Sequence, residues 1–302
     1  MDYNPHEMDI PNNKCLIITG MHRSGTSLGA SLLQAAGLSI GNQLLGETVG
    51  NLKGHFENMD FLEFHRNVLE ENKLHPDGWD LQTILYQEQY ADIARKIIAA
   101  NSHLYWGWKD PRTTLFLDFW QALLPDACYL FIYRAPWEVV DSLFRRHTDE
   151  IFVSSPTLAL KTWKFYNKNL LKFSLRNPDK SLLINIDDFI ANPGKVLEMI
   201  NTKFEFKLKT KVSELFDKNH FNQGNINPKH LRSIVEHYST EEFELFCQLE
   251  KLNSFSERSH TNASPVSNED MMRLIYDLWY HQYDCINHDG AKTAERQPSH
   301  GE

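Results

Sequence analysis

The sequence predicts an α/β fold: a central parallel β-sheet flanked by helices on both faces, followed by a mostly helical C-terminal part. Short apolar runs alternate along the chain with longer segments whose apolar residues recur at helical spacing. The runs are too short for helices and are apolar at successive positions, as in strands that are buried on both faces. Polar residues follow several runs directly, at the strand ends where parallel sheets bind their ligands.

Glycine, proline and serine mark the boundaries of the expected elements. The expected strands are 14–19, 105–108, 127–133 and 181–186. The expected helices are 24–36, 58–72, 87–100, 113–124, 136–146, 155–175, 193–204, 240–252 and 268–283. Gly37 closes the first helix, Pro125 stops the fourth, and Pro136 lies in the first turn of the fifth. Ser155 is expected as an N-cap, with Pro156 at the first helical position.

The 302 residues have 41% apolar content, which suffices for one large domain. We expect a single domain over residues 14–286, with a flexible N-terminus at 1–13 and a flexible tail at 287–302. The N-terminus has no cationic segment followed by an apolar stretch, and no apolar run approaches the roughly 20 residues of a membrane span. We therefore expect a cytoplasmic protein without a membrane partner.

The net charge of −9 argues against broad nucleic-acid binding, which needs a basic face. It still permits a small phosphate-bearing ligand, because such a site needs only a few local cations. The four cysteines are scattered, and neither they nor the fourteen histidines show metal-ligand spacing. We expect free thiols in a reducing compartment, no nucleic-acid partner and no metal. The oligomeric state stays open.

A glycine-rich segment, Gly20 to Ser27, joins the first strand to the first helix in the frame Gly-x4-Gly-Thr-Ser. Such a turn points backbone N–H groups at an anion, and the helix N-terminus adds positive potential. A plain βα turn is the alternative, which His22 and Arg23 beside the glycines disfavour. A nucleotidase loop carries Lys directly after its second glycine, where this sequence has Thr26. The loop therefore suits one phosphate and its substituent better than a metal-bound triphosphate.

A second candidate anion site follows the third expected strand. Arg134 lies at the strand end, and Ser142 comes eight positions later, about two turns into the next helix at about 3.6 residues per turn. A guanidinium and a hydroxyl there can hold one phosphate from two sides, because the guanidinium fork binds two oxygens. A surface arginine and a helix-face serine are the alternative for this motif taken alone.

Together the two motifs resemble those of the sulfotransferases that use 3′-phosphoadenosine-5′-phosphosulfate (PAPS) as donor. The segment 182–189, followed by Asn192-Pro193, is similar to the family's strand and turn before a late helix. The resemblance covers roughly residues 14–205 and is greatest to bacterial-type members with a Gly-Met-His-Arg-Ser-Gly-Thr-Ser loop. It implies a P-loop sulfotransferase fold, PAPS as donor and 3′-phosphoadenosine 5′-phosphate (PAP) as product.

The resemblance also implies which residues bind the donor. The 5′-phosphosulfate would be held by Arg23, Ser24, Gly25, Thr26 and Ser27, and the 3′-phosphate by Arg134 and Ser142. Two departures stand beside this match. Cytosolic small-molecule members place a Trp that stacks on adenine just after the loop, where this chain has Leu28, and their C-terminal Arg-Lys-Gly segment is not found here. The adenine-stacking residue therefore stays open.

Sulfuryl transfer needs a base for the O–H or N–H of the acceptor and positive charge for the leaving phosphate. In several sulfotransferase branches a glutamate after the first helix is the base, and Glu57 is the matching residue here. His55 is a second candidate base. The structural alternative for Glu57 is a carboxylate that favours the dipole of the following helix.

The segment after the second strand supplies candidate cations. Lys109 or Arg112 could neutralise the developing charge, with Asp110 orienting one of them. A structural ion pair is the competing interpretation of the same residues. His22, in the loop, is a further candidate for contact with the transferred group.

Three functions fit these observations. They are a PAPS-dependent sulfotransferase, a P-loop kinase or nucleotidase acting on a small molecule, and a module that binds PAP without turnover. The missing loop lysine and the Arg134–Ser142 motif favour the first. The acidic balance favours a small acceptor, such as a natural-product alkaloid of secondary metabolism or a neutral sugar, and leaves O- or N-sulfation open. Candidate pocket residues, with core packing as the alternative, are Phe56, Trp79, Trp106 and Trp108.

Overall fold

The computed structural model describes residues 13–46, 54–146, 151–152, 155–210, 229–255 and 272. The expected flexible N-terminus at 1–13 lies outside these residues except for Asn13, and so does the expected helix at 268–283 except for Met272. The expected tail at 287–302 lies outside them entirely.

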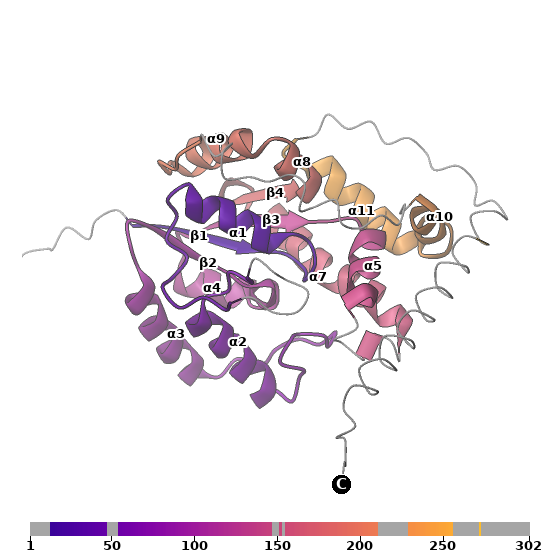
Figure 1. Cartoon of the computed structure of the whole chain (residues 1–302). Helices are drawn as coiled ribbons and strands as arrows, with labels where there is room; N and C mark the ends of the chain where they lie inside the picture. The colour runs from indigo at the N-terminus through magenta and orange to yellow at the C-terminus, as the bar shows by residue number, and fades with distance from the viewer. Residues whose placement is uncertain are drawn as a thin grey trace, which may run out of the picture. The chain divides into compact units, whose positions relative to one another are not determined.

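A four-stranded parallel sheet forms the centre of the fold, in the order β2-β1-β3-β4 (Figure 1). Its strands are β1 (Lys14–Thr19), β2 (Tyr105–Lys109), β3 (Cys128–Tyr133) and β4 (Ser181–Asn185). All four expected strands are present, and their interiors are buried, as expected for strands that are covered on both faces. Because the strands are parallel, their carboxyl ends meet at one edge of the sheet.

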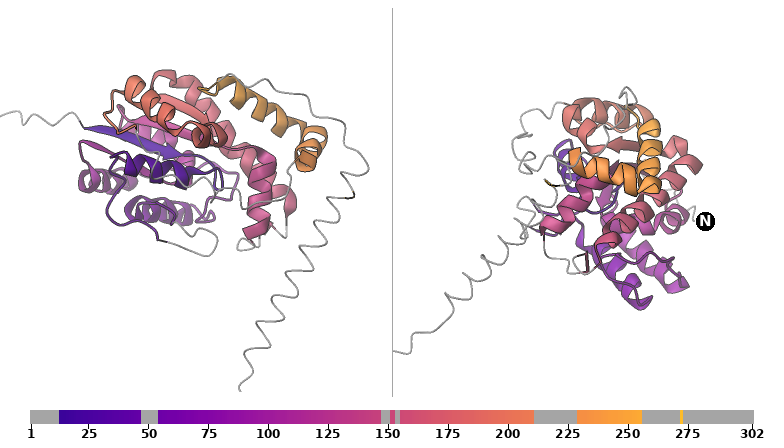
Figure 2. Two further views of the ribbon diagram at one scale, coloured as in Figure 1. Left: turned by 45° about the horizontal axis from the view of Figure 1, so that its top comes forward. Right: turned by 90° about the vertical axis from the view of Figure 1, so that its right-hand side faces the viewer.

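Helices connect the strands and cover both faces of the sheet, so the predicted fold class is confirmed. In the unit that contains the sheet they are α1 (Thr26–Ala35), α2 (Met59–Glu71), α3 (Glu88–Asn101), the 3-10 helix η1 (Pro111–Leu115), α4 (Leu117–Leu123), α5 (Pro136–Arg146), α7 (Pro156–Arg176), the 3-10 helix η2 (Pro178–Lys180), α8 (Ile186–Ala191), α9 (Pro193–Phe204) and α11 (Thr240–Leu252). A further helix, α10 (Lys229–Tyr238), belongs to a second unit and is described by itself. Figure 2 shows these layers from two further directions. The described C-terminal part is helical, as expected.

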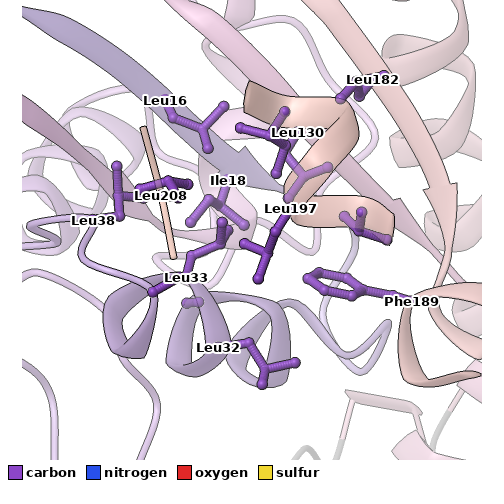
Figure 3. Close-up of a cluster of buried hydrophobic side chains, with 14 of the residues drawn as sticks. Leu16, Ile18, Leu32, Leu33, Leu38, Leu130, Leu182, Phe189, Leu197 and Leu208 are labelled. Carbon is purple, nitrogen blue, oxygen red and sulfur yellow. The ribbon is translucent and has the colours of Figure 1, made fainter. Parts of the chain in front are cut away.

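An aliphatic core fills one face of the sheet (Figure 3). Leu16 and Ile18 of β1 meet Leu33 of α1, together with side chains of β3, β4, α8 and α9. The alternate positions of each strand point to this face, as the two-residue period of a strand requires. Each fully buried leucine or isoleucine contributes about 1.5–3 kcal/mol to folding, so this face holds α1, and with it the preceding loop, firmly against the sheet.

An aromatic core fills the opposite face. Trp108 of β2 stacks on Phe61 of α2 with ring centroids 4.0 Å apart, and Trp120 of α4 lies 4.9 Å from Trp108. Tyr129 of β3 packs edge-on against Phe173 of α7 at 4.6 Å. Pairs of this kind add about 0.5–1.5 kcal/mol to the burial of their rings. The candidate pocket residue Trp108 is therefore part of the core.

Local departures from the expected elements have identifiable causes. The expected helix at 113–124 is divided into η1 and α4, because the Asp110 carboxylate accepts from the backbone N–H of Arg112 and starts a turn at Pro111. The short α8 was not expected; the Asn185 side chain caps it by accepting from the N–H of Asp187. Ser155 precedes α7 as expected, but within the described residues its side chain makes no capping bond.

The described residues fall into two compact units. The first contains residues 13–210 and 241–255 within their described ranges, and the second contains residues 229–240 and 272. The sheet and every candidate site residue belong to the first unit. The expectation of a single domain over 14–286 stays a prediction.

In the first unit, α11 is tied to the sheet by buried polar contacts. The Glu250 carboxylate accepts from the Tyr133 hydroxyl at 2.7 Å and from the Asn185 amide at 2.6 Å. Asn253 donates to Asp188 of α8. These bonds join the last described helix of this unit to the carboxyl ends of β3 and β4.

Candidate functional site

The candidate residues gather at the carboxyl edge of the sheet, where three strand ends meet. Thr19 ends β1, Lys109 ends β2, and Arg134 follows β3. The Thr19 hydroxyl donates to the carbonyl oxygen of Asp110 at 2.9 Å, which fixes the segment after β2 against the start of the glycine-rich loop. Parallel pairing therefore brings together polar groups that are about a hundred residues apart in sequence.

The glycine-rich loop has the backbone form of an anion cradle. Gly25 caps α1 in the left-handed region at φ 86°, and Arg23 adopts φ 67°. A Cβ at Gly20 would collide with the carbonyl oxygen of Ile132, so the loop passes directly over β3. Within the described residues no side chain caps α1, and the first N–H groups of a helix have no partners of their own within the helix. These N–H groups are available to a bound anion.

Ser24 adds an unsatisfied hydroxyl to the loop. The residue is fully buried, and its Oγ atom has no hydrogen-bond partner among the residues that the structure describes. A buried hydroxyl without a partner costs about 1–3 kcal/mol, so its presence in the loop requires a compensating ligand or water. The loop residue thus fits the bonding needs of a phosphate or sulfate oxygen.

The loop and the second expected anion site lie in direct contact. Arg23 Nε donates to Ser142 Oγ on α5 at 2.9 Å, across 119 residues of sequence. Arg134 stands at the start of the same connection, and its Nε donates to the Glu138 carboxylate at 2.8 Å, one turn later. Arg134 is partly exposed, and its contact with Glu138 uses Nε and not the two terminal nitrogens of the guanidinium.

Glu57 reaches the same place from the other side of the loop. The Ser27 hydroxyl donates to the carbonyl oxygen of His55 at 3.0 Å, which ties the loop to the segment that carries Glu57. Glu57 Oε1 accepts from Lys109 Nζ at 2.8 Å, and Glu57 Oε2 lies 3.6 Å from Arg112 Nη1. The exposed fractions of the Glu57 and Lys109 side chains are 6% and 1%. The candidate base is therefore one half of a buried ion pair.

Asp110 orients Arg112 and not Lys109, which decides between the two arrangements left open by the sequence. Asp110 Oδ1 accepts from Arg112 Nη1 at 2.9 Å. Burial would raise the pKa of Asp110, but the Arg112 guanidinium and a bond from His65 hold it well below its usual range. Asp77, beside Arg112, contributes with Asp110 and Glu57 to raising the pKa of that guanidinium. Asp110 and Arg112 are thus both charged at neutral pH.

His22 lies in the loop next to an aromatic wall. Its ring is 4.4 Å from Trp79 and 6.1 Å from Tyr166 between centroids. Burial, and then Arg112, lower the pKa of His22 to about 3, although Asp77 and Asp110 oppose them. The imidazole is therefore neutral at pH 7. Its buried Nε2 atom has no hydrogen-bond partner among the described residues.

The sequence reasoning missed three residues of this cluster. His65, which was not among the candidate residues, is fully buried and bonded to Asp110. Its position on the apolar face of α2, four residues after Phe61, was a signal for burial with a polar partner. Asp77 and Glu138 had no comparable signal, because their contacts depend on how loops and helix ends meet.

The four aromatic residues proposed for a pocket lie in different places in the structure. Trp106 and Trp108 lie in the core, 6.0 Å apart between ring centroids. Phe56 is only partly buried and packs against the aliphatic core. Trp79 packs against a residue of the glycine-rich loop, the His22 ring.

The described residues contain neither a metal-binding cluster nor a membrane-spanning helix. No group of three or more His, Cys, Asp or Glu side chains in the described ranges is arranged to hold a metal ion. Likewise, none of the helices described here combines the length and the apolar character that crossing a bilayer requires.

Comparisons with known proteins agree with the geometry. A model of the Sulfotransferase family matches residues 16–209, more than half of the chain. The sulfotransferase domain of the Synechococcus PCC 7002 olefin synthase is 17% identical with a TM-score of 0.41, over 93% of this chain and 99% of that one. The sulfotransferase domain from the curacin biosynthetic pathway is 13% identical with a TM-score of 0.42, over 89% and 98%. Sulfotransferase STF9 from Mycobacterium avium is 11% identical with a TM-score of 0.46, over 79% and 76%. Among curated proteins, none matches.

Proposed function

The chain belongs to the sulfotransferase family, and on this premise we propose that it transfers a sulfuryl group from PAPS to a hydroxyl or amine of a small acceptor. The observation that carries the proposal is the bond from Arg23 Nε to Ser142 Oγ, 2.9 Å long. It joins the loop assigned to the 5′-phosphosulfate to the helix assigned to the 3′-phosphate. Both ends of one adenosine bisphosphate can therefore be held by a single continuous site.

The loop suits the 5′-phosphosulfate end of the donor. The N–H groups at the start of α1 supply positive potential, and the buried Ser24 hydroxyl needs a partner. Thr26 and Ser27 contribute the first positions of the helix, where anions are favoured. No lysine follows Gly25, so the loop has no side chain that would reach the terminal phosphate of a nucleoside triphosphate.

Arg134 suits the 3′-phosphate. The bond to Glu138 occupies Nε and directs the guanidinium, so that the two terminal nitrogens can bind two oxygens of one phosphate. Together with Ser142, this contact would distinguish PAPS from donors that lack a 3′-phosphate. Selection of the donor would therefore depend on the helix α5 and its first turn.

The chemical step follows from the Glu57–Lys109 pair. An acceptor oxygen or nitrogen forms a bond to the sulfur, and the bond from sulfur to the donor's phosphate oxygen breaks, which releases PAP. Glu57, which is paired with Lys109, takes the proton of the acceptor. Lys109 and Arg112 supply positive charge while negative charge develops on the leaving phosphate. His55 remains the second candidate base, and His22 a contact for the transferred group.

The acceptor class follows from the charge balance. With a net charge of −9, the chain favours a neutral or cationic small molecule over a polyanion. We place the reaction in the cytoplasm and in secondary metabolism, without a metal. No disulfide joins the cysteines of the described residues, Cys15, Cys128 and Cys247.

Incubation with labelled PAPS and a panel of small alcohols and amines, with products read by mass, tests the activity. Glu57→Gln should lower kcat by about 10²–10⁴-fold while PAP binding is retained, since only proton transfer is removed. The matched control is Glu63→Gln, at an exposed position of α2, which should leave kcat unchanged. Magnesium-dependent phosphate transfer from ATP, or full activity of Glu57→Gln, would contradict the proposal.

A binding experiment tests the donor site separately. Arg134→Ala should weaken PAP binding at least about 10-fold but leave binding of adenosine 5′-phosphate nearly unchanged, because only PAP carries the 3′-phosphate. Arg176→Ala, an exposed arginine paired with Asp118, is the control. Equal weakening of both nucleotides would remove Arg134 from the 3′-phosphate site.

A further inference from the structure

A chain of three buried hydrogen bonds, followed by an ion pair, runs from the aromatic core to the candidate base. Trp120 Nε1 donates to His65 Nε2 at 2.9 Å, and His65 Nδ1 lies 2.7 Å from Asp110 Oδ2. Asp110 Oδ1 in turn binds Arg112, whose Nη1 atom is 3.6 Å from Glu57 Oε2. His65 and Asp110 are both fully buried. The chain therefore links α2, α4 and the end of β2 to Glu57 through contacts between protein groups.

The first bond fixes the tautomer of His65. An indole N–H can only donate, so the Nε2 atom of His65 must accept and cannot carry a proton. The ring proton is then on Nδ1, where it is donated to Asp110. Burial lowers the pKa of His65 against the opposing effect of Asp110, which is consistent with a neutral ring.

The second step fixes Asp110. With Oδ2 satisfied by His65, the other oxygen, Oδ1, accepts both the Nη1 atom and the backbone N–H of Arg112, at 2.9 and 3.0 Å. Without His65, Oδ2 would be buried with no partner, and rotation of the carboxylate would compete for the guanidinium. The same Nη1 atom faces Glu57, so any shift of Arg112 alters the charge next to the candidate base.

We propose that His65 is a positioning residue for sulfuryl transfer: its Nδ1–H holds Asp110, and through it Arg112, in the arrangement that Glu57 requires. This inference rests on the proposed function. His65 does not touch the donor or the acceptor, because it is fully buried and its bonds are to Trp120 and Asp110. Its effect is therefore on the chemical step and not on nucleotide binding.

Two variants of His65 separate its two bonds. Asn places an amide N–H close to the position of Nδ1 and keeps the donor to Asp110, whereas Gln places its amide group near Nε2 and keeps a partner for Trp120 only. His65→Gln should lower kcat by about 10–100-fold, the loss typical when an outer hydrogen-bond partner of a functional group is removed. His65→Asn should recover most of that loss. PAP affinity and the KM for the acceptor should stay within about 3-fold in both, and His103→Gln, at an exposed histidine, is the control.

A merely structural role would lower the kcat of both variants equally, in proportion to their loss of folded protein. That result would overturn the proposal. Equal kcat in wild type and His65→Gln would overturn it as well. Nitrogen-15 NMR of the wild-type histidines provides a readout that needs no activity and no substitution. One ring should be neutral at pH 7 with its proton on Nδ1, the nitrogen that donates to Asp110. A His65 proton on Nε2 would refute the inference.

Failure of the proposed function gives a different pattern. If wild type transfers no sulfuryl group to any acceptor and does not bind PAP, the proposed function is wrong whatever the NMR shows. If wild type is active and the two His65 variants do not differ, only the positioning role is wrong.

Discussion

Replacing Lys109 by methionine would remove the cation that lies 2.8 Å from Glu57 Oε1, in a pair whose side chains are 1% and 6% exposed. At an effective dielectric constant of about 20, the attraction at this distance is about 6 kcal/mol. Much of it offsets the cost of burying both charges, so the pair itself stabilises the fold much less than this. Removing one partner is more severe, and typically costs about 3–5 kcal/mol, because the other charge stays buried.

The structure places the expected loss at the lower end of this range. Arg112 remains 3.6 Å from Glu57 Oε2 after the change and keeps an attraction of about 5 kcal/mol at the same dielectric constant. We therefore expect Lys109→Met to lower the free energy of unfolding by about 3 kcal/mol. Lys164→Met should lower it by only about 0.2–1 kcal/mol, because Lys164 is 23% exposed and its partner Glu241 is 73% exposed, although its second partner, Glu242, is mostly buried.

Urea denaturation followed by tryptophan fluorescence measures these losses. A double variant, Lys109→Met with Glu57→Leu, tests the cause, because it leaves no unpaired charge of this pair. It should recover at least about 2 kcal/mol of the sum of the two single losses. A loss below about 1 kcal/mol for Lys109→Met, or additive losses in the double variant, would refute the assignment of a buried ion pair.

Three further changes have expected outcomes that denaturation curves can check. Gly25→Ala should destabilise the chain by about 1–3 kcal/mol, because the backbone at φ 86° is strained for alanine and the added Cβ would clash with the Ile186 side chain. The loss should exceed that of Gly37→Ala, where φ is 107° but no atom lies within 4 Å of the added Cβ. Smaller losses at Gly25 than at Gly37 would show that the loop relaxes. Acid should destabilise the chain through His22, because its pKa in the folded state, about 3, lies below the ordinary value. The unfolded state therefore binds a proton first as the pH falls. The free energy of unfolding should decrease by up to about 2 kcal/mol between pH 7 and 5. In His22→Asn this part of the pH dependence should vanish; an unchanged profile would mean that the imidazole is not held neutral. Tyr133→Phe should lower the free energy of unfolding by about 1.5–3 kcal/mol, because the Glu250 carboxylate loses a 2.7 Å hydrogen bond. An unchanged free energy of unfolding would mean that water replaces the hydroxyl.

Much of the fold could be predicted because its signals are local. Every predicted strand is short and mostly apolar. The bounds of α5 and α9 match the prediction where Pro136 and Pro193 set the first turn. The 3-10 helix η1, which begins at Pro111, was missed because it depends on the Asp110 side chain, which accepts from the N–H of Arg112. The six-residue α8 was too short to leave a periodic pattern.

The site was predictable to the extent that its groups follow strand ends. Arg23, Lys109 and Arg134 could be named because parallel strands bring their carboxyl ends to one edge. Their pairing could not be named, since the 2.8 Å contact of Lys109 with Glu57 depends on where the segment before α2 lies. The burial of His65 and the bond from Arg23 to Ser142 likewise depend on helix packing between distant parts of the chain.

The bonds from Glu250 to Tyr133 and Asn185 set where the folded unit can end. The family match stops at residue 209, yet the acceptor for these two strand-end donors lies 41 residues further along. A fragment cut at residue 209 would lack Glu250, so the Tyr133 hydroxyl and the Asn185 amide would lose their acceptor. Tyr133 directly precedes Arg134 in the sequence. The boundary of the sequence family is thus not the boundary of the stable protein, and a shortened chain that is to keep its nucleotide-binding edge intact must extend past Asn253.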